Sequence, residues 1–260
     1  MNYLLIFLFG LILGSFLNVV IYRIPQGESI IIPPSKCPNC KTPLKWYHNL
    51  PLVSYVLLRG KCAFCKTKIS WHYPLVEILT ATLLVVLYYK FYNLYGYSVF
   101  LAYTYFVSLL IGISFIDLFH REIPDLLSFP LIFGGWLFSL MEINPFVSHF
   151  FDSLISAFAG MGLLFFINEF YYLFAKRDGM GMGDFKLMGG LGAFLGYKSF
   201  FSILFFSTLI ALMVYGFLLI FKKIRHKELE EKNLLKAEIP YGPFLSLSAL
   251  LYLFYPQSPL

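Results

Sequence analysis

Charged residues are scarce in this sequence, and their scarcity excludes an ordinary soluble protein. Asp, Glu, Lys and Arg make up 13% of the 260 residues, whereas 59% are hydrophobic. Soluble globular domains carry about 25% charged and about 45–50% apolar residues. The mean hydropathy of +0.74 instead favours repeated bilayer spans, each of which needs roughly 20 mostly apolar residues. We therefore expect an all-α polytopic membrane protein with about eight transmembrane helices.

The N-terminus lacks both marks of a cleavable signal peptide, a basic region before the apolar run and a small-residue cleavage site after it. Residues 1–22 are therefore expected to remain as the first transmembrane helix. The nearest positive charge, Arg23, follows this run and places the N-terminus outside under the positive-inside rule. Gly10 and Gly14 have the GxxxG spacing that is typical of close helix packing.

Apolar runs and basic loops alternate along the whole chain. The runs fall at about 3–22, 75–93, 99–116, 127–141, 153–175, 187–197, 200–221 and 243–255. From an outside N-terminus, the cytosolic loops are 23–74, 117–126, 176–186 and 222–242. All but two of the 20 Lys and Arg residues, Lys90 and Lys198, lie in these loops. The net charge of +6 is therefore explained by basic cytosolic loops that orient the chain and contact anionic lipid, and not by a nucleic-acid surface.

The sixth apolar run, 187–197, is too short for an ordinary span. The basic loops on either side of it both require the cytosolic face, so this span must borrow residues from Gly179–Lys186. Because a helix rises about 1.5 Å per residue, the borrowing draws Asp184 toward the membrane surface. The charged loop 222–242 is expected to extend the seventh helix.

Residues 23–74 form the one sizeable polar domain, between the first helix and a transmembrane domain at 75–260. Prolines 33, 34, 38, 43 and 51 and the absence of a helical period predict turns and loops there, and so small a segment needs a cross-link such as a metal site. No internal repeat is predicted.

Cysteine occurs four times, and every copy lies in this cytosolic loop, as Cys37-x-x-Cys40 and Cys62-x-x-Cys65. Two such pairs at this separation are typical of a zinc ribbon, in which four thiolates complete a tetrahedral structural site. A reducing compartment argues against disulfides. A redox pair and an iron–sulfur site are the alternatives. The sequence therefore predicts a small cytosolic zinc-ribbon-like insertion.

Two aspartates, Asp117 and Asp184, stand at the ends of apolar runs, where ionisable groups are costly and are by default candidates for function. Glycines 179, 181 and 183 precede Asp184 and indicate an unwound segment, with a plain flexible turn as the alternative. Asp125 follows Pro124 and precedes an apolar run, as a helix N-cap would. Two partly desolvated carboxylates close together titrate as a pair and can activate water, as in aspartic proteases.

These residues resemble the GxGD membrane proteases, and specifically the bacterial type IV prepilin peptidases. Besides both CxxC pairs and GMGDFKL at 181–187, the resemblance rests on GSFLNVVIYRIP at 14–25, NLPLVSY at 49–55, LRGKC at 58–62, ISWHYPLVE at 69–77, ID at 116–117, IPD at 123–125 and PYGPF at 240–244. One departure is Asp178-Gly179, where the family often has Glu followed by Ala or Gly.

The resemblance implies a bifunctional enzyme of the bacterial inner membrane, serving type IV pili and type II secretion. It would cleave the basic leader of prepilins and pseudopilins after a glycine, on the cytosolic side. It would then N-methylate the new terminal residue, usually Phe, with S-adenosylmethionine as donor. The resemblance assigns Asp117 and Asp184 as the catalytic pair, with Asp125, Lys186, Gly181 and Gly183 in support.

Methyl transfer maps by the same resemblance to the zinc-bearing loop and the first helix. The chain has no G-x-G-x-x-G on a strand–helix unit, so no ordinary nucleotide-binding fold holds the donor. Gly60 is a candidate for a methyl-transfer role, and a tight-turn glycine explains it equally well. The alternatives to the bifunctional enzyme are a relative that only cleaves and a zinc-stabilised transporter whose aspartates relay protons or cations.

Overall fold

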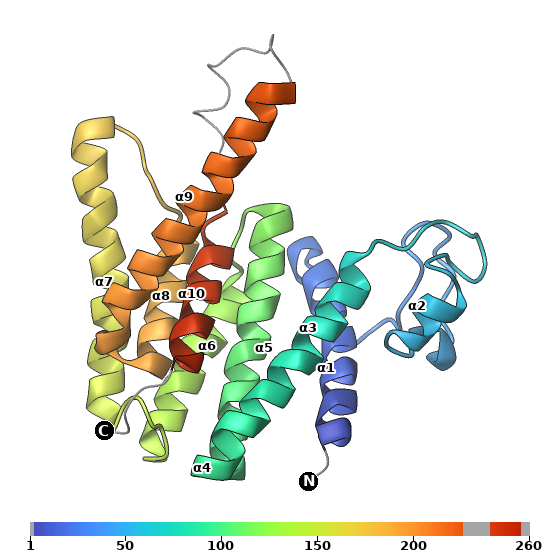
Figure 1. The fold of residues 1–260 in the computed structure, drawn as a ribbon, viewed down its shortest axis with the longest axis horizontal. Coiled ribbons are helices and arrows are strands. Elements are labelled where there is room, and N and C mark those ends of the chain that lie inside the picture. Colours follow the sequence, from blue (N-terminus) through green and yellow to red (C-terminus); the bar gives the residue numbers. More distant parts are fainter. Residues whose placement is uncertain (1–2, 226–239, 256–260) are drawn as a thin grey trace. The chain divides into compact units, whose positions relative to one another are not determined.

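The chain folds almost entirely into helices. The computed structural model describes residues 3–225 and 240–255, and over these ranges it has two isolated β-bridges and no strand (Figure 1). The all-α prediction is therefore confirmed. The helices are α1 Tyr3–Arg23, η1 Ile24–Gln26, η2 Trp46–Asn49, α2 Val53–Leu57, α3 His72–Leu87, the π-helical η3 Tyr88–Tyr92, α4 Asn93–Tyr95, α5 Tyr97–His120, α6 Asp125–Leu140, α7 Phe150–Ala175, α8 Met182–Leu195, η4 Tyr197–Ser199, α9 Phe200–Arg225 and α10 Gly242–Phe254.

Each predicted apolar run coincides with a helix. In the part of the chain that the structure describes, five helical stretches are long and apolar enough to cross a membrane: Tyr3–Gln26, His72–Tyr95, Tyr97–His120, Phe150–Ala175 and Tyr197–Leu218. The apolar helices α6 and α10 are shorter, and α8 has 14 residues. Eight crossings and their orientation therefore stay predictions. The predicted extension of the seventh helix reaches Arg225, and residues 226–239 lie outside the described part of the chain.

Two compact units divide the chain inside α5, at Met1–Gly112 and Ile113–Leu260. In the first unit α1 packs closely on α3. A Cβ added at Gly10 would lie 2.5 Å from Cα of Ala81, and one at Gly14 would lie 2.6 Å from Cα of Glu77. These contacts confirm that the GxxxG pair serves helix packing. The sequence predicted a boundary between a polar loop domain, 23–74, and a transmembrane domain, 75–260. The division into packing units does not test that boundary, which stays a prediction.

In the second unit α8 is the central helix, packed between α6 and α7 (Figure 1). A Cβ added at Gly192 would lie 2.4 Å from the carbonyl oxygen of Ser156. At the end of α8, the carbonyl of Ala193 accepts a hydrogen bond from Ser153 (2.8 Å), and that of Phe194 accepts one from Asn144 (3.1 Å). Because side chains satisfy its last carbonyls, this short helix can end inside the protein.

The loop between α1 and α3 contains two matching turns. Cys37 N–H donates to Thr42 O (3.0 Å), and Cys62 N–H donates to Thr67 O (2.8 Å) at the same offset. Lys41 and Lys66 take φ values of 58° and 61°. The sequence Lys-Cys-x-x-Cys-Lys-Thr occurs at both places, so the prediction of no internal repeat is wrong. The repeat was missed because it spans only one turn.

Candidate active site and metal centre

Asp117 lies in the last turn of α5 and is 5% exposed. Its Oδ2 accepts a hydrogen bond of 2.8 Å from the backbone N–H of Gly242, at the start of α10. A helix C-terminus carries partial negative charge and disfavours a carboxylate, and burial adds to the cost. Fold stability therefore gives no reason for an acid at this position.

Asp184 lies in the first turn of α8 and is 8% exposed. Its Oδ2 accepts a hydrogen bond of 3.1 Å from the N–H of Gly181, the N-cap residue of the helix. This contact is half of a capping box, so Asp184 also has a structural role. Because α8 begins at Met182, it takes in residues that precede the apolar run, as the sequence predicted.

The two aspartates belong to one site in the second unit, where the negative charge of Asp117 acts on Asp184. Ile123 packs beside Gly183, in the first turn of α8, and beside Gly242, the backbone donor to Asp117. A Cβ added at Gly183 would lie 2.7 Å from Cβ of Ile123, and one at Gly242 would lie 3.2 Å from its Cδ1. The sequence analysis missed Ile123 and Gly242 as parts of this site, although both stand in the motifs IPD and PYGPF.

The segment before α8 is non-helical over residues 176–181, as the glycines predicted. Asn168 of α7 holds this segment in place. Its Oδ1 accepts hydrogen bonds from the N–H groups of Gly179 (2.8 Å) and Met180 (3.1 Å), and its Nδ2 donates to Asp178 Oδ1 (3.2 Å). The segment is therefore an anchored turn. Asn168 was not among the predicted site residues, although an amide inside an apolar run is a usable signal.

Asp125 and Lys186 form an ion pair between α6 and α8. The Lys186 ammonium lies 2.5 Å from Asp125 Oδ1 and 5.2 Å from the centroid of the Phe129 ring. Helix α6 has Pro124 as its N-cap residue, and no side chain caps it. The N-cap interpretation of Asp125 is therefore wrong: its carboxylate is one position too far into the helix and binds Lys186 instead.

The four cysteines meet in the first unit with their Sγ atoms all within 4.8 Å of one another. The Sγ atoms of Cys37 and Cys65 are 3.8 Å apart. A tetrahedral site with Zn–S bonds of about 2.3 Å has edges of about 3.8 Å, so the cluster fits a zinc ion. Asn39 in the first turn donates to Thr67 in the second (2.7 Å), which ties the two pairs together.

The thiols of this cluster differ in acidity. Burial raises the pKa of Cys37 to about 11, whereas hydrogen bonding with Thr67 lowers the pKa of Cys65 to about 6. The Cys65 thiol is therefore the more acidic of the two, and Cys37 holds its proton more tightly. Because a metal binds thiolates, binding at this cluster must release protons.

Comparison with known proteins assigns the chain to a family. The model of the bacterial peptidase A24 N-terminal domain matches residues 8–91, and that of the type IV leader peptidase family matches residues 104–217. The chain is 36% identical to the prepilin leader peptidase/N-methyltransferase of Aeromonas hydrophila, over 98% of this chain and 91% of the relative. The chain belongs to the type IV leader peptidase family. Proteins of the same name match in Legionella pneumophila, at 35% identity over 98% of this chain and 92% of the relative, and in Neisseria gonorrhoeae, at 38% over 78% of each.

No solved structure matches the chain. Membership of the type IV leader peptidase family, together with the apolar helices, makes the chain a multi-pass membrane protein. The transporter interpretation has no support from these relatives.

Gly60 of this leader peptidase occupies a turn. It has φ = 67°, and a Cβ there would lie 3.1 Å from the hydroxyl of Tyr55. Its carbonyl accepts a hydrogen bond of 2.7 Å from Ile69 N–H. The structure thus agrees with the tight-turn explanation, and a role in methyl transfer stays a prediction.

Proposed function

We propose that this chain cleaves the leader of type IV prepilins and pseudopilins and then methylates the new N-terminus, with Asp117 and Asp184 as the catalytic pair. The observation that carries the peptidase half is the pair itself. Two buried carboxylates from different helices interact electrostatically. Each accepts one hydrogen bond from the backbone N–H of a glycine. The names of the relatives support both halves.

The pair has the chemistry needed for hydrolysis. Two interacting carboxylates in a poorly solvated site share a proton, so one is a base while the other is an acid. The base removes a proton from a water molecule, whose oxygen attacks the peptide carbonyl carbon. The acid protonates the carbonyl oxygen, and the tetrahedral intermediate then collapses with protonation of the leaving amine. The Gly242 bond on one oxygen of Asp117 fixes the orientation of that carboxylate.

The site suits a substrate that is itself a membrane helix. Asp117 ends the candidate span Tyr97–His120, and Asp184 begins a helix rich in apolar residues. A scissile bond at the cytosolic end of a transmembrane segment would lie at the same depth in the membrane as the carboxylates of Asp117 and Asp184. We further propose that the N-terminus lies outside and that the active site and the loop 23–74 face the cytosol, which the distribution of Lys and Arg supports.

Methyl transfer belongs in this proposal to the first unit. The cysteine cluster would hold a structural zinc that shapes residues 23–74, because four thiolates leave the metal no position for water. S-adenosylmethionine supplies a methyl group bonded to a positively charged sulfur. When bound, this donor would supply the methyl group to the new N-terminal amine of the pilin, which would have to give up a proton.

The supporting residues act through position. The Lys186–Asp125 pair links the helix that carries Asp184 to α6, and the Gly181 N–H holds the Asp184 carboxylate. Gly183 leaves room for Ile123 beside the site. None of these residues is assigned proton transfer.

The test incubates the purified full chain with a prepilin and S-adenosylmethionine labelled in its methyl group. Asp117→Asn and Asp184→Asn should each lower the rate of cleavage by about 10²–10⁴, since each removes an acid–base group. Asp152→Asn, an acid in the first turn of α7, is the matched control and should cleave like the wild type.

Full cleavage by either dyad variant would remove the catalytic assignment. Cleavage without label on the product would leave a peptidase only. If the wild type cleaves no prepilin at all, the peptidase half fails.

A further inference from the structure

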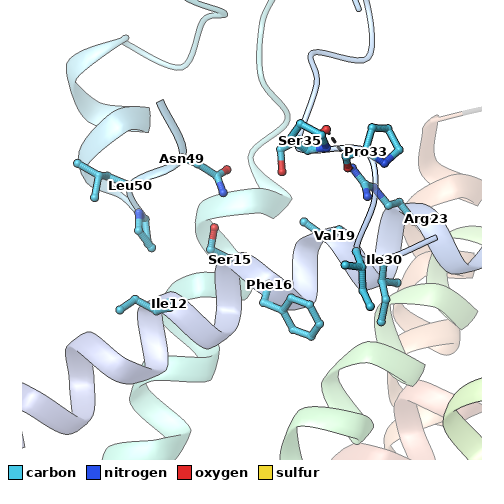
Figure 2. Close-up of a pocket in the computed structure, with 13 residues that line it drawn as sticks. Ile12, Ser15, Phe16, Val19, Arg23, Ile30, Pro33, Ser35, Asn49 and Leu50 are labelled. Atoms are coloured by element: carbon cyan, nitrogen blue, oxygen red, sulfur yellow. Dashed lines mark hydrogen bonds between the residues drawn. The ribbon is translucent and has the colours of Figure 1, made fainter. Parts of the chain in front are cut away.

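A pocket of about 410 Å³ lies in the first unit, between α1 and the loop that follows it (Figure 2). The α1 residues that line it include Ile12, Phe16, Val19 and Arg23, whose spacing places them along one face of the helix. Residues 30–31, 33–35 and 49–51 form the opposite wall. Small-molecule sites usually have volumes of about 300–1,000 Å³, so this pocket has the size of a ligand site.

The pocket combines an apolar side with a few polar groups. Ile12 and Phe16 of α1 are exposed and contribute apolar surface to the pocket. Ser15, Ser35 and Asn49 bring polar atoms to the pocket. Within residues 3–225 and 240–255, the side-chain amide of Asn49 makes no hydrogen bond. An amide that stabilises no part of the fold is available to a ligand.

Arg23 provides a positive charge at one end of the pocket. It is 4% exposed, and its guanidinium donates to the carbonyls of Ser29 (2.8 Å), Pro33 (2.7 Å) and Pro34 (3.3 Å). Among the described residues, no carboxylate lies within ion-pair distance of it. Carbonyl oxygens solvate this charge but do not neutralise it, so an anionic group nearby is favoured.

The zinc-bearing loop builds the wall that faces α1. Ser35 O accepts a hydrogen bond of 2.7 Å from Leu44 N–H, on the far side of the first cysteine turn. Leu52, beside the second stretch of wall, donates its N–H to Glu77 Oε2 of α3 (2.8 Å). The shape of the pocket therefore depends on the cysteine turns and on the packing of α3.

We propose that this pocket binds S-adenosylmethionine, and this inference rests on the proposed methyltransferase function. The donor is an amphiphile that matches the pocket group by group. Its carboxylate suits the end that carries Arg23, and its hydroxyl and amino groups suit Asn49 and Ser15. Its adenine ring and its sulfonium are both attracted to an aromatic face such as that of Phe16. The peptidase aspartates lie in the other unit, so the pocket is not part of their site.

The experiment measures binding of labelled S-adenosylmethionine to the full chain in lipid nanodiscs, together with prepilin cleavage and methylation. Val19→Trp fills the pocket and should lower affinity at least tenfold. Asn49→Ala removes one hydrogen bond from the ligand and should lower affinity by about two- to tenfold. Leu8→Trp, at an exposed α1 position outside the pocket, and Asn93→Ala, at an exposed asparagine of the same unit, should bind like the wild type.

Retained prepilin cleavage and zinc content show that the variants fold. The inference is overturned if Val19→Trp and Asn49→Ala bind the donor like the wild type. It is also overturned if a phospholipid copurifies with the wild type and is lost from Val19→Trp while donor binding is unchanged, since the pocket then holds lipid. A wild type that cleaves but neither binds the donor nor methylates refutes the methyltransferase function itself. A wild type that methylates while both pocket variants do so equally well refutes only the pocket assignment.

Discussion

The backbone N–H of Gly242 donates a hydrogen bond of 2.8 Å to Oδ2 of Asp117, and a Cβ at position 242 would lie 2.7 Å from that same oxygen. Only glycine allows the backbone to approach the carboxylate this closely. Among the described residues, Oδ1 of Asp117 accepts no hydrogen bond. One oxygen is thus fixed by the start of α10, while the other is left for water or substrate.

Gly242→Ala should lower the rate of prepilin cleavage by about 10- to 100-fold, because its Cβ displaces the Asp117 carboxylate and misplacement of a catalytic group by about 1 Å can cost that much. The measurement is single-turnover cleavage with saturating prepilin. Gly216→Ala, in α9, is the control because a Cβ there meets nothing within 4 Å. Wild-type cleavage by Gly242→Ala would show that the position of Asp117 does not depend on this contact.

Asn168→Ala should loosen the segment that leads into Asp184. It removes the acceptor of the N–H groups of Gly179 and Met180, and each lost hydrogen bond costs about 0.5–1.5 kcal/mol. We expect a lower melting temperature and slower cleavage, with new protease sensitivity near residue 179. Asp178→Asn keeps an acceptor for Asn168 Nδ2 and should behave like the wild type. Equal protease sensitivity of the two variants would contradict the anchoring role.

The helices and the positions of the two aspartates follow from sequence because local signals specify them. Apolar runs determine the helices, and the spacing of Cys37, Cys40, Cys62 and Cys65 is by itself enough to indicate a common metal site. The same reasoning placed Asp117 and Asp184 at helix ends, where the structure has them.

The hydrogen-bond and ion-pair partners of the site residues could not be predicted from local sequence signals. Gly242 is distant in sequence from Asp117, and no periodicity links a backbone N–H of one helix to a carboxylate of another. Asp125 shows the limit of a local rule. Its position after Pro124 resembled a cap, but the carboxylate lies one position into the helix and pairs with Lys186, a distant residue that no local rule links to it.

A double-mutant cycle on Asp125 and Lys186 tests whether their ion pair supports the active site. The pair is partly exposed, with side-chain exposures of 59% and 26%, so its contribution to stability should be at most about 1 kcal/mol. We expect Asp125→Asn and Lys186→Met each to slow cleavage less than about tenfold, and the double variant to be no slower than the worse single one. Additive losses in the double variant would mean that the two residues act separately.

Removal of the metal should separate the two activities. The fresh protein is expected to hold about one zinc ion per chain, bound by four thiolates, and Cys62→Ser should lose it. Without the metal, the first cysteine turn, next to Ser35, loses its link to the second, and the pocket wall that contains Ser35 loses its shape, so methylation should fall at least about tenfold. Cleavage should persist, because Asp117, Asp184 and their hydrogen-bond donors all lie in the other unit.

The control is Ala63→Ser, which changes the same turn without altering a metal ligand and should keep both zinc and methylation. The measurement is metal analysis of each protein together with the cleavage and methylation assays. A fresh protein free of metal would refute the zinc site. A Cys62→Ser variant that lost cleavage and methylation together would show that the loop supports the peptidase as well.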